Sequence, residues 1–566
     1  MSELATKHKM MKDVEDALNE TKTTLGSLYD IMLDDSNMVA GAQFYQNEVE
    51  KYKKDGKPLV KINTLLKTIM TITGMERTAR TQISYAPIEG ADNAAASVWT
   101  KAAKWAMMGC NAEEILSEVF MEGCIMGLNW ITVDLDFGKD PVNGDLVVDH
   151  SNTFEVGFDP YSNRVDYSDA MYVYKRKLVP KGRVKARFPG KSKEIEKLGA
   201  APESGLTVQK DETNQRKDMV ELIEYWYKTY EEKIILYGDN GPIESSLSEE
   251  EFDEYVMNGG EYKKSIVQKI KLFLVANREL VLYDGYSPHN VHTNFPIFPY
   301  FCIYFVNQKR WDLRVLSVTR EIKSPQREKN FRRSALQYQT GTSTRSGWMA
   351  EVGSVDEEAV FQNVGGSAQV IWYNYSKKPE RIVPLPIDVA LVQLEQMSDN
   401  DSIMAGPNAD IIGMSVDKGA TATTSKMRYK QGVAYLQSMF DNYSLMKRSI
   451  GRYILELLTE NWDVKKLRRI VGEEAAQYIP DDFMELSKMA RFDVHTYETI
   501  SSPTNRMTMR DDLKDMNQYG IHVPGQMFVE LWDIAPEEKE RYTALLQQEQ
   551  QLRLKEAGRM QGGQNG

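Results

Sequence analysis

The sequence EEILSEVFMEGCIMGLNWITVDLDF, residues 113–137, changes from a helical to a strand pattern at Gly127. Before the glycine, the Ala- and Met-rich stretch 91–126 predicts one long, buried helix that Gly127 ends. After it, the segment 128–137 reads as a strand, and further short strands follow. Because both kinds of element are present, we expect an α+β fold that is rich in helix.

The pattern N-terminal to this change is helical over the first 125 residues. Residues 59–80 repeat apolar side chains with the period of a helix, at Leu59, Ile62, Leu65, Leu66, Ile69 and Ile72. On the other side of the change, turns separate strands at 128–137, 145–150, 151–160 and 170–177. Pro180 starts a short helix, KGRVKARF, and the polar stretch 190–217 reads as a linker.

A second block of strands is predicted from about Met219 to Phe305, interrupted by a short acidic helix at 248–258. The segment FPIFPYFCIYFVN, residues 295–307, is the most apolar stretch of the chain. Its prolines exclude a membrane-spanning helix, so we expect an extended, buried segment.

Helix returns at 311–341, where Gly341 is the predicted end. Strands follow at 368–375 and 380–386, then a helix near 387–404 and a loop rich in Gly, Pro, Thr and Ser at 405–424. A long helix is predicted at 425–461, and the chain from Arg506 onward reads as helical.

The overall composition excludes several classes of protein. The chain has 566 residues, of which 42% are hydrophobic and 27% charged, so it is neither disordered nor fibrous. Its formal net charge of −12 argues against a general nucleic-acid coat, because Lys and Arg supply most affinity for phosphates. Its three cysteines indicate a reducing compartment, and we expect a soluble protein made in a cytoplasm, without a membrane segment.

The usual catalytic motifs are absent from the sequence, and no catalytic residue, metal or cofactor is predicted. There is no phosphate-binding loop, dinucleotide fingerprint, zinc-protease motif or nucleophile elbow. His289 and His292 have a spacing compatible with a metal, but a loop with two solvated histidines is the better interpretation. Asp134 and Asp136 share one face of a strand, and we favour a hairpin with an acidic face over a two-metal site.

One basic segment, Lys309 to Arg333, stands out in this acidic chain. Its cations include Arg320, Lys323, Arg327, Lys329, Arg332 and Arg333. They could form a solvated or intersubunit helix face with pairs such as Glu328 and Arg332, or face a phosphate backbone or an acidic partner. Spacing alone leaves both interpretations open.

Four segments resemble the portal (head-to-tail connector) proteins of tailed bacteriophages, in particular those of short-tailed phages. The most specific is SPQREKNFRRS at 324–334, which is similar to the stem-helix motif of the family. The others are NWITV at 129–133 with the FDP turn at 158–160, the loop at 406–425 with the helix after it, and FDV at 492–494 with SSPTNR at 501–506.

The resemblance implies a wing, stem helices, a strand-rich clip, a long tunnel-side helix and a small helical crown. The implied boundaries are 1–176 and 342–500 for the two parts of the wing, 177–199 for the first stem helix region, 200–310 for the clip, 311–341 for the second stem helix, and 501–566 for the crown and tail. The second wing part would contain the tunnel loop 405–424 and the long helix 425–461.

The implied function is a ring of about twelve subunits at one capsid vertex, through which double-stranded DNA is packaged and later ejected. The implied partners are the large terminase subunit, the major capsid and scaffolding proteins, and tail adaptor proteins, with assembly in the host cytoplasm. A channel should bind DNA weakly, because each phosphate contact must be broken as the DNA moves.

In the architecture that the resemblance implies, two groups of residues are candidate sites in addition to the basic helix. Asp410, Gly413, Asp417, Lys418 and Gly419 would belong to the tunnel loop that lies close to the duplex. Tyr225, Trp226 and Tyr227 would form a clip interface, because aromatic residues are enriched in interface cores. Two alternatives stay open: another structural protein of the virion head-tail region or tail, and a terminase-like or nuclease-like enzyme.

Overall fold

The computed structural model describes residues 3–78, 80–87, 93–201, 218–238, 241–244, 261–344, 422–472 and 492–498, with residue 257 and short pieces within 348–397 and 479–548. Helices and sheets are mixed, which confirms the helix-rich α+β class. The chain divides into two compact units. The first contains Met1–Asp30, Met70–Val315 and Gln437–Gly566, and the second contains Ile31–Ile69 and Leu316–Leu436.

The described helices vary from single turns to the 40-residue helix α13, which has about eleven turns. They are α1 (Glu3–Val39), α2 (Gln46–Lys54), α3 (Thr64–Thr78), α4 (Asn93–Gly109), α5 (Ala112–Met126), α6 (Lys181–Arg187), α7 (Ser192–Lys197), α9 (Trp311–Arg314), α10 (Val318–Thr344), α13 (Ala422–Asn461), α14 (Val464–Val471) and α18 (Gly525–Glu530), with short 3₁₀ turns at Thr153–Glu155 and Pro189–Lys191.

The described strands are mostly short, and two of them are long. They are β1 (Thr81–Pro87), β2 (Leu128–Asp136), β3 (Asp145–Ser151), β4 (Val156–Phe158), β5 (Tyr172–Pro180), β6 (Met219–Gly238), β7 (Gly241–Glu244), β8 (Glu261–Ala276), β9 (Leu280–Tyr286), β10 (Ile297–Phe301), β11 (Ile303–Tyr304), β12 (Val315–Leu316), β13 (Trp348–Met349), β14 (Glu380–Arg381) and β15 (Phe492–Glu498).

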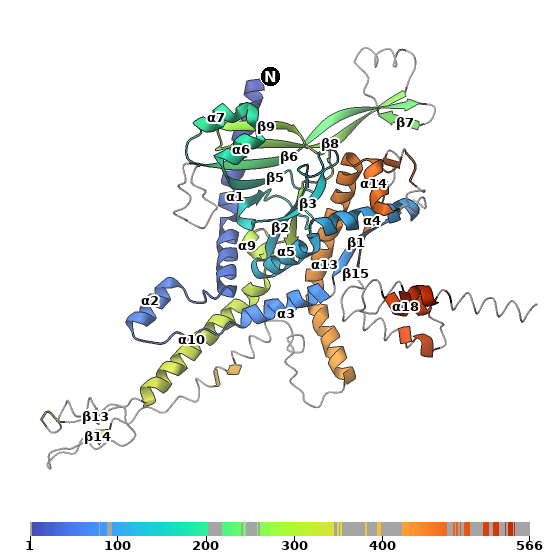
Figure 1. The fold of residues 1–566 in the computed structure, drawn as a ribbon. Helices are drawn as coiled ribbons and strands as arrows, with labels where there is room; N and C mark the ends of the chain where they lie inside the picture. Colours follow the sequence, from blue (N-terminus) through green and yellow to red (C-terminus); the bar gives the residue numbers. More distant parts are fainter. Residues whose placement is uncertain are drawn as a thin grey trace, which may run out of the picture. The chain divides into compact units, whose positions relative to one another are not determined.

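The largest sheet of the first unit is antiparallel and has the strand order β4-β5-β6-β8-β9, with β7 paired to β6 (Figure 1). Strand β6 pairs with β5 over Met219–Tyr227 and with β8 over Leu222–Tyr237. Beyond Tyr227 the strands β6 and β8 continue as a two-stranded ribbon. The boundary predicted at residue 200 therefore crosses a single sheet, because β5 before it is hydrogen-bonded to β6 after it.

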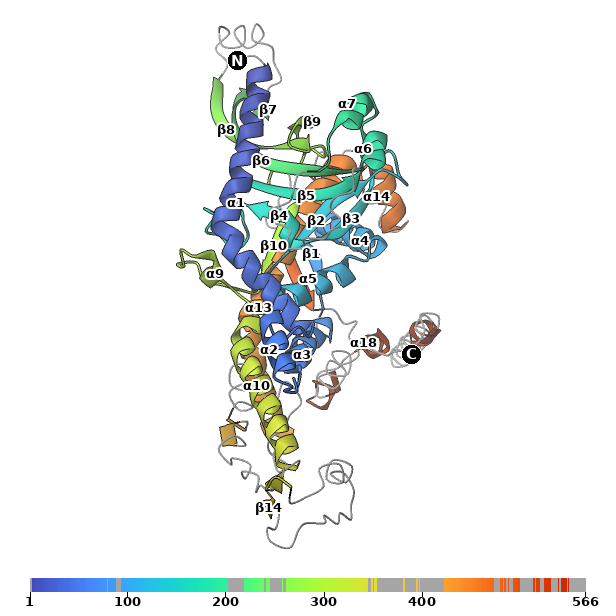
Figure 2. The same cartoon turned by 90° about the vertical axis from the view of Figure 1, so that its left-hand side faces the viewer.

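Helices cover both faces of this sheet, as the alternation of side chains along the strands requires. Ile223, Tyr225 and Phe273 point to one face, where they pack against Val14 and Leu18 of α1, which crosses the sheet in Figure 2. On the opposite face, residues of even number pack against α6 and α7: Val220, Leu222, Leu274 and Ala276 contact Val184, Ile195 and Leu198. The predicted first stem region, 177–199, thus holds the end of β5 and two short helices that pack on the sheet.

The change of pattern at Gly127 is confirmed. Helix α5 ends at Met126, Gly127 has a left-handed φ of 94°, and β2 begins at Leu128. Strand β2 then pairs with β3 and with β10 in a three-stranded sheet. All five residues of β10 are buried, so the extended, buried segment expected in 295–307 is confirmed for its first part, whereas Phe305 and Val306 at its end are exposed. Asp134 and Asp136 lie in the predicted hairpin, formed by β2 and β3.

The predicted long helix at 425–461 is confirmed as α13. Within the first unit, its second half packs against a two-stranded sheet of β1 and β15. A Cβ atom at Gly451 would lie 2.7 Å from Val494 Cγ1 and 2.8 Å from Ile83 Cγ2, so only glycine allows this close approach. The Tyr85 hydroxyl donates a hydrogen bond to the Gly451 carbonyl at 2.9 Å.

Four helical predictions are wrong in extent. The helix predicted at 59–80 begins only at Thr64 and ends at Thr78, as α3. The stretch 91–126 forms two helices, because the chain breaks at Asn111, which adopts a φ of 52°. The first 125 residues are not all helical, since they include β1. The helix expected at 311–341 begins as the single turn α9, and α10 then runs to Thr344 because Gly341 is tolerated inside it.

The second unit contains α2, α10, the end of α1, the start of α3 and an antiparallel pair, β13 and β14. Other predicted elements lie outside the described residues: nearly all of the acidic helix 248–258, the strand 368–375, most of the helix 387–404, loop residues 405–421 and much of the predicted crown.

Candidate functional site: the basic helix α10

Helix α10 carries all six cations predicted as a basic face, and acids of the second unit bind four of them. The central acid is Asp35 at the end of α1, whose side chain is fully buried. It accepts hydrogen bonds from Arg320 Nε at 3.2 Å, from Lys323 Nζ at 2.9 Å and from the Ser317 hydroxyl at 3.0 Å. Ser317 also caps α10, because its hydroxyl accepts from the Arg320 amide at 3.0 Å.

Lys323 is held in its charged form by two aspartates. Burial acts to lower the pKa of Lys323, but its hydrogen bonds to Asp34 and Asp35 outweigh that effect and raise the pKa above its ordinary value. Charge pairs of this kind are costly to break once they are buried, since the remaining partner keeps an uncompensated charge. Asp35 therefore fastens α10 to the end of α1.

The next cations along α10 are also paired. Arg327 binds Glu48 of α2 at 2.7 Å, and its guanidinium lies 4.0 Å from the centre of the Tyr45 ring. Arg332 binds Glu328 one turn earlier, which is the i, i+4 pair expected from the sequence. Lys329 is partly buried and Arg333 is exposed. The structure thus supports the interpretation that Arg320, Lys323, Arg327 and Arg332 form intrachain pairs.

A row of buried polar side chains on α10 was not predicted from the sequence. Gln326, Asn330 and Ser334 are spaced four residues apart and are at most 1% exposed. They accept hydrogen bonds from alternate backbone amides of one extended segment: Thr64 at 3.2 Å, Ile62 at 3.0 Å and Val60 at 2.9 Å, respectively. The two spacings match because four helical residues rise ~6 Å and two extended residues span ~6.7 Å.

Gln43 completes this row from the other side. Its side-chain oxygen accepts hydrogen bonds from the amide groups of Asn330 and Gln326. The ring of Phe331 packs edge-on against the ring of Phe44, at 5.2 Å between ring centres. The motif 324–334 therefore combines a charged face with a polar row that binds backbone, and the four-residue spacing of its Gln, Asn and Ser was the available signal.

The aromatic cluster predicted as a clip interface lies in strand β6 of the first unit. Tyr225 and Trp226 are 6% and 7% exposed, and Tyr225 stacks on Tyr172 at 5.6 Å. Tyr227 is partly buried beside Tyr225, at 5.8 Å between ring centres. These side chains are thus largely used inside the subunit. The tunnel-loop residues Asp410, Gly413, Asp417, Lys418 and Gly419 lie outside the described residues.

Of the histidines and aspartates considered as metal ligands, His289 and Asp134 contact each other, whereas His292 and Asp136 take separate partners. His289 Nε2 lies 2.6 Å from Asp134 Oδ1, whereas His292 Nδ1 accepts from the Ile270 amide at 3.4 Å. Asp136 accepts a hydrogen bond from the amide of Gly138 in the following turn. Within the described part of the chain, no cluster of His, Cys, Asp and Glu is arranged to hold a metal ion.

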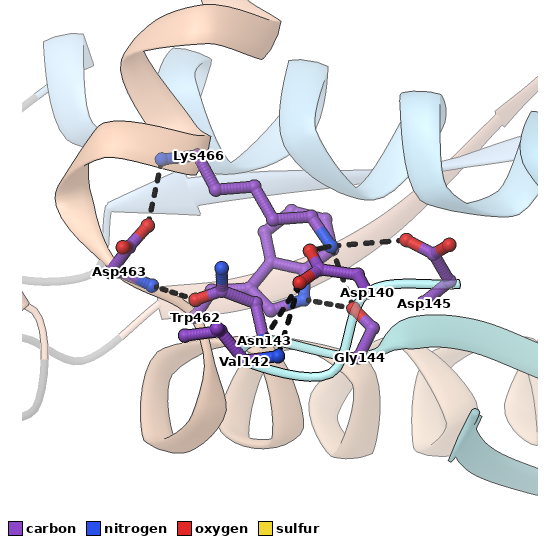
Figure 3. A network of polar contacts seen from close by, with 8 residues as sticks. All are labelled: Asp140, Val142, Asn143, Gly144, Asp145, Trp462, Asp463 and Lys466. Carbon is purple, nitrogen blue, oxygen red and sulfur yellow. Dashed lines mark hydrogen bonds and ion pairs between the residues drawn. The ribbon is translucent and has the colours of Figure 1, made fainter. Parts of the chain in front are cut away.

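A second buried charge network joins the β2–β3 turn to α14 in the first unit (Figure 3). Lys466 Nζ donates to Asp140 at 3.0 Å, to Asp145 at 3.1 Å and to the Gly144 carbonyl at 2.6 Å. The hydrogen bond from Lys466 is the main cause that lowers the pKa of Asp140 to about 2. Trp462 Nε1 also donates to the Gly144 carbonyl, at 3.2 Å.

The described part of the chain combines a helix-rich α+β architecture with the long helix α13 and the basic helix α10. The chain matches the model of the phage P22-like portal protein family over residues 22–564, and it belongs to this family. A search of curated proteins gave no significant match.

The protein is thus a phage portal protein, a head-tail connector that forms a ring and a DNA channel at the capsid vertex and acts in capsid assembly and genome packaging. The family is structural rather than enzymatic, and the alternative functions gain no support from the match. Among the described helices, none is both long and apolar enough to cross a membrane.

Proposed function

We propose that twelve copies of this chain form the ring, and that its channel moves DNA with little attraction to the phosphates. The proposal of weak attraction to DNA rests on the net charge of the chain and on the pairing of its cations. The chain has a net charge of −12, and four cations of α10 are bound to carboxylates of the same chain. The excess of acids lowers the overall attraction of the chain for phosphates, and the four paired cations of α10 are engaged within the subunit. Each phosphate contact would have to be broken as the duplex advances, so weak attraction favours movement.

The stoichiometry can be measured directly on the purified chain. Native mass measurement of the full-length protein should give closed rings of about twelve subunits. A folded monomer at micromolar concentration would contradict ring formation, and rings of another size would contradict only the number.

The tunnel loop is proposed at residues 405–424, with Asp410, Gly413, Asp417, Lys418 and Gly419 nearest the DNA. Small residues let a loop follow the duplex closely, and glycines supply the conformational freedom to change shape. Replacing Gly413 and Gly419 by Val should leave rings intact but shorten the packaged genome or reduce its retention and ejection. Heads with normal DNA content would show that this loop is not in the channel.

We propose that the clip, which docks the large terminase subunit and later the tail adaptors, follows α10 rather than occupying 200–310. In the family order a clip comes after a stem helix, and β13 and β14 form a separate antiparallel pair after α10. The block 200–310 instead supplies β6 and β8, the centre of the main sheet.

Two exposed side chains distinguish these assignments. Met349 of β13 is 63% exposed, and Tyr230 of β6 is 58% exposed. With rings of each variant, Met349→Asp should weaken terminase binding and Tyr230→Asp should not. The reverse result would restore the clip at 200–310. Binding to the major capsid and scaffolding proteins and assembly in the host cytoplasm belong to the same proposal.

A further inference from the structure

The first unit contains an open hollow of about 660 Å³ beside the Lys466 network. Its walls are α4, the turn between β2 and β3, and α14, which supply Trp105, Val142 and Lys465 among others. A second hollow of about 270 Å³ adjoins it and shares Trp105, Lys139 and Asp145. Trp105 therefore lines both hollows, and its side chain is exposed.

The hollow has a rigid wall, because the network in Figure 3 fixes the turn against α14. Lys466 bridges Asp140 and Asp145, and the Asp463 amide donates to Asn143 Oδ1 at 2.9 Å. Asp463 also caps α14 by accepting from the Lys466 amide at 2.8 Å. A preformed wall lowers the entropy cost of binding, since it need not become ordered when a ligand arrives.

The exposed chemistry of the hollow is aromatic and cationic. The Trp105 ring is 44% exposed and lies near Val142, which is 76% exposed. Lys139, Lys465 and Arg469 are exposed at the rim, and none of them has an ion pair with a described residue. The lining holds four cations and three carboxylates, a formal net charge of +1, and the exposed rim cations are those without an ion pair to a described residue.

We propose that this hollow binds a short acidic segment of another protein, with one aromatic or aliphatic side chain placed against Trp105. Acidic side chains would pair with the rim cations, and the apolar side chain would gain from burial against the indole. A DNA duplex fits less well, because its bases are stacked away from an exposed indole and three aspartates share the wall with the cations.

The test uses the intact full-length protein and a fluorescein-labelled peptide of sequence Glu-Glu-Asp-Phe-Glu-Asp-Glu, followed by fluorescence polarisation. The expected result is saturable binding that weakens as salt rises. Binding should fall at least tenfold when Phe is replaced by Ala in the peptide, and be lost when its acids are replaced by Lys. A peptide that fails to bind, or binds equally well as its Lys version, overturns the proposal.

Protein variants locate the site. Trp105→Ala and the double variant Lys465→Glu with Arg469→Glu should each weaken binding at least tenfold. The control is Lys101→Glu, which changes an exposed cation of α4 outside the hollow and should leave binding unchanged. The double variant alters only exposed rim residues, so it stays informative if Trp105→Ala fails to fold. Unchanged binding by the double variant contradicts the site. A duplex oligonucleotide that binds in its place and is weakened by the same variants assigns the hollow to DNA and also overturns the proposal.

Discussion

The backbone amide of Ile62 donates a hydrogen bond to Asn330 Oδ1 at 3.0 Å, across 268 residues of sequence. Asn330 is fully buried and Ile62 is partly buried, so loss of this acceptor would leave the amide poorly paired. The pair shows how the second unit is held together. The side chain of a helix residue supplies the hydrogen-bond acceptor that the backbone of a neighbouring strand would supply in a sheet.

Replacing Asn330 by Leu should therefore expose the segment around Ile62 to exchange with solvent. An orphaned buried amide costs about 1–3 kcal/mol, which corresponds to roughly fivefold to 150-fold faster local opening. Hydrogen exchange of the peptide that covers residues 58–65 measures this local opening. Ser324→Ala, an exposed position of the same helix, is the control and should leave exchange unchanged. Equal protection in both variants would contradict the role of Asn330.

Asp35→Asn should strongly destabilise the second unit. The substitution keeps the shape of the side chain but removes the buried charge that Arg320 and Lys323 share. Loss of a buried partner typically costs about 3–5 kcal/mol, and the remaining pair of Lys323 with Asp34 places the expected cost at the lower end. Thermal unfolding of the full-length chain is the measurement. Asp30→Asn, at an exposed position of the same helix, should unfold like the wild type. If the unfolding curves of the two variants coincided, Asp35 would not contribute this stability.

Gly451 and Gly26 should respond in opposite ways to the same substitution. A Cβ at Gly451 meets two β-branched side chains, Val494 and Ile83, at less than 3 Å, so Gly451→Ala should cost about 1–3 kcal/mol. No atom lies within 4 Å of a Cβ at Gly26 in helix α1, so Gly26→Ala should stabilise by about 0.5–1 kcal/mol. Thermal unfolding of the two variants compares them, and a gain at Gly451 would contradict the close approach.

Lys447 should make stability rise with pH. Burial lowers the pKa of this lysine to about 8, and its ammonium donates to the Thr81 carbonyl at 3.2 Å. Because the folded-state pKa lies below the ordinary value of 10.5, the unfolded state binds more protons above pH 8, and stability increases with pH there.

The test compares unfolding midpoints between pH 7 and 9.5 for the wild type and Lys447→Met. The wild type should gain more stability over this range than the variant. Lys175, whose pKa burial also lowers to about 8, remains in both proteins and cancels in the comparison. Parallel curves would show that Lys447 does not titrate in this way.

Local patterns predicted the elements whose signals lie within a few residues of each other. The end of α5 at Gly127, the short helix after Pro180, the buried strand at 297–301 and the long helix α13 all follow from spacing, glycine and proline. Each of these elements is specified by its own local sequence, so a single sequence was sufficient to predict it.

Pairings between distant segments were not predictable in the same way. Strand β1 is short and pairs with β15, as in Ser84 opposite His495, which lies 411 residues away. The pairing of β5 with β6 across residue 200, the expected start of the clip, was not predicted for a similar reason, because a polar stretch separates the two strands in sequence while hydrogen bonds join them in space. The counter-ions of Arg320, Lys323 and Arg327 come from α1 and α2, and nothing in α10 itself indicates which acids they are.

The contacts between the segment 60–64 and α10 also set an order of events during synthesis. Thr64 leaves the ribosome 262 residues before its acceptor, Gln326. At roughly 5–20 residues per second, translation separates the two by roughly 13–50 s. During that interval the polar backbone of the segment has only water to bind. The contacts between this segment and α10 can therefore form only late, after more than half of the chain has been made.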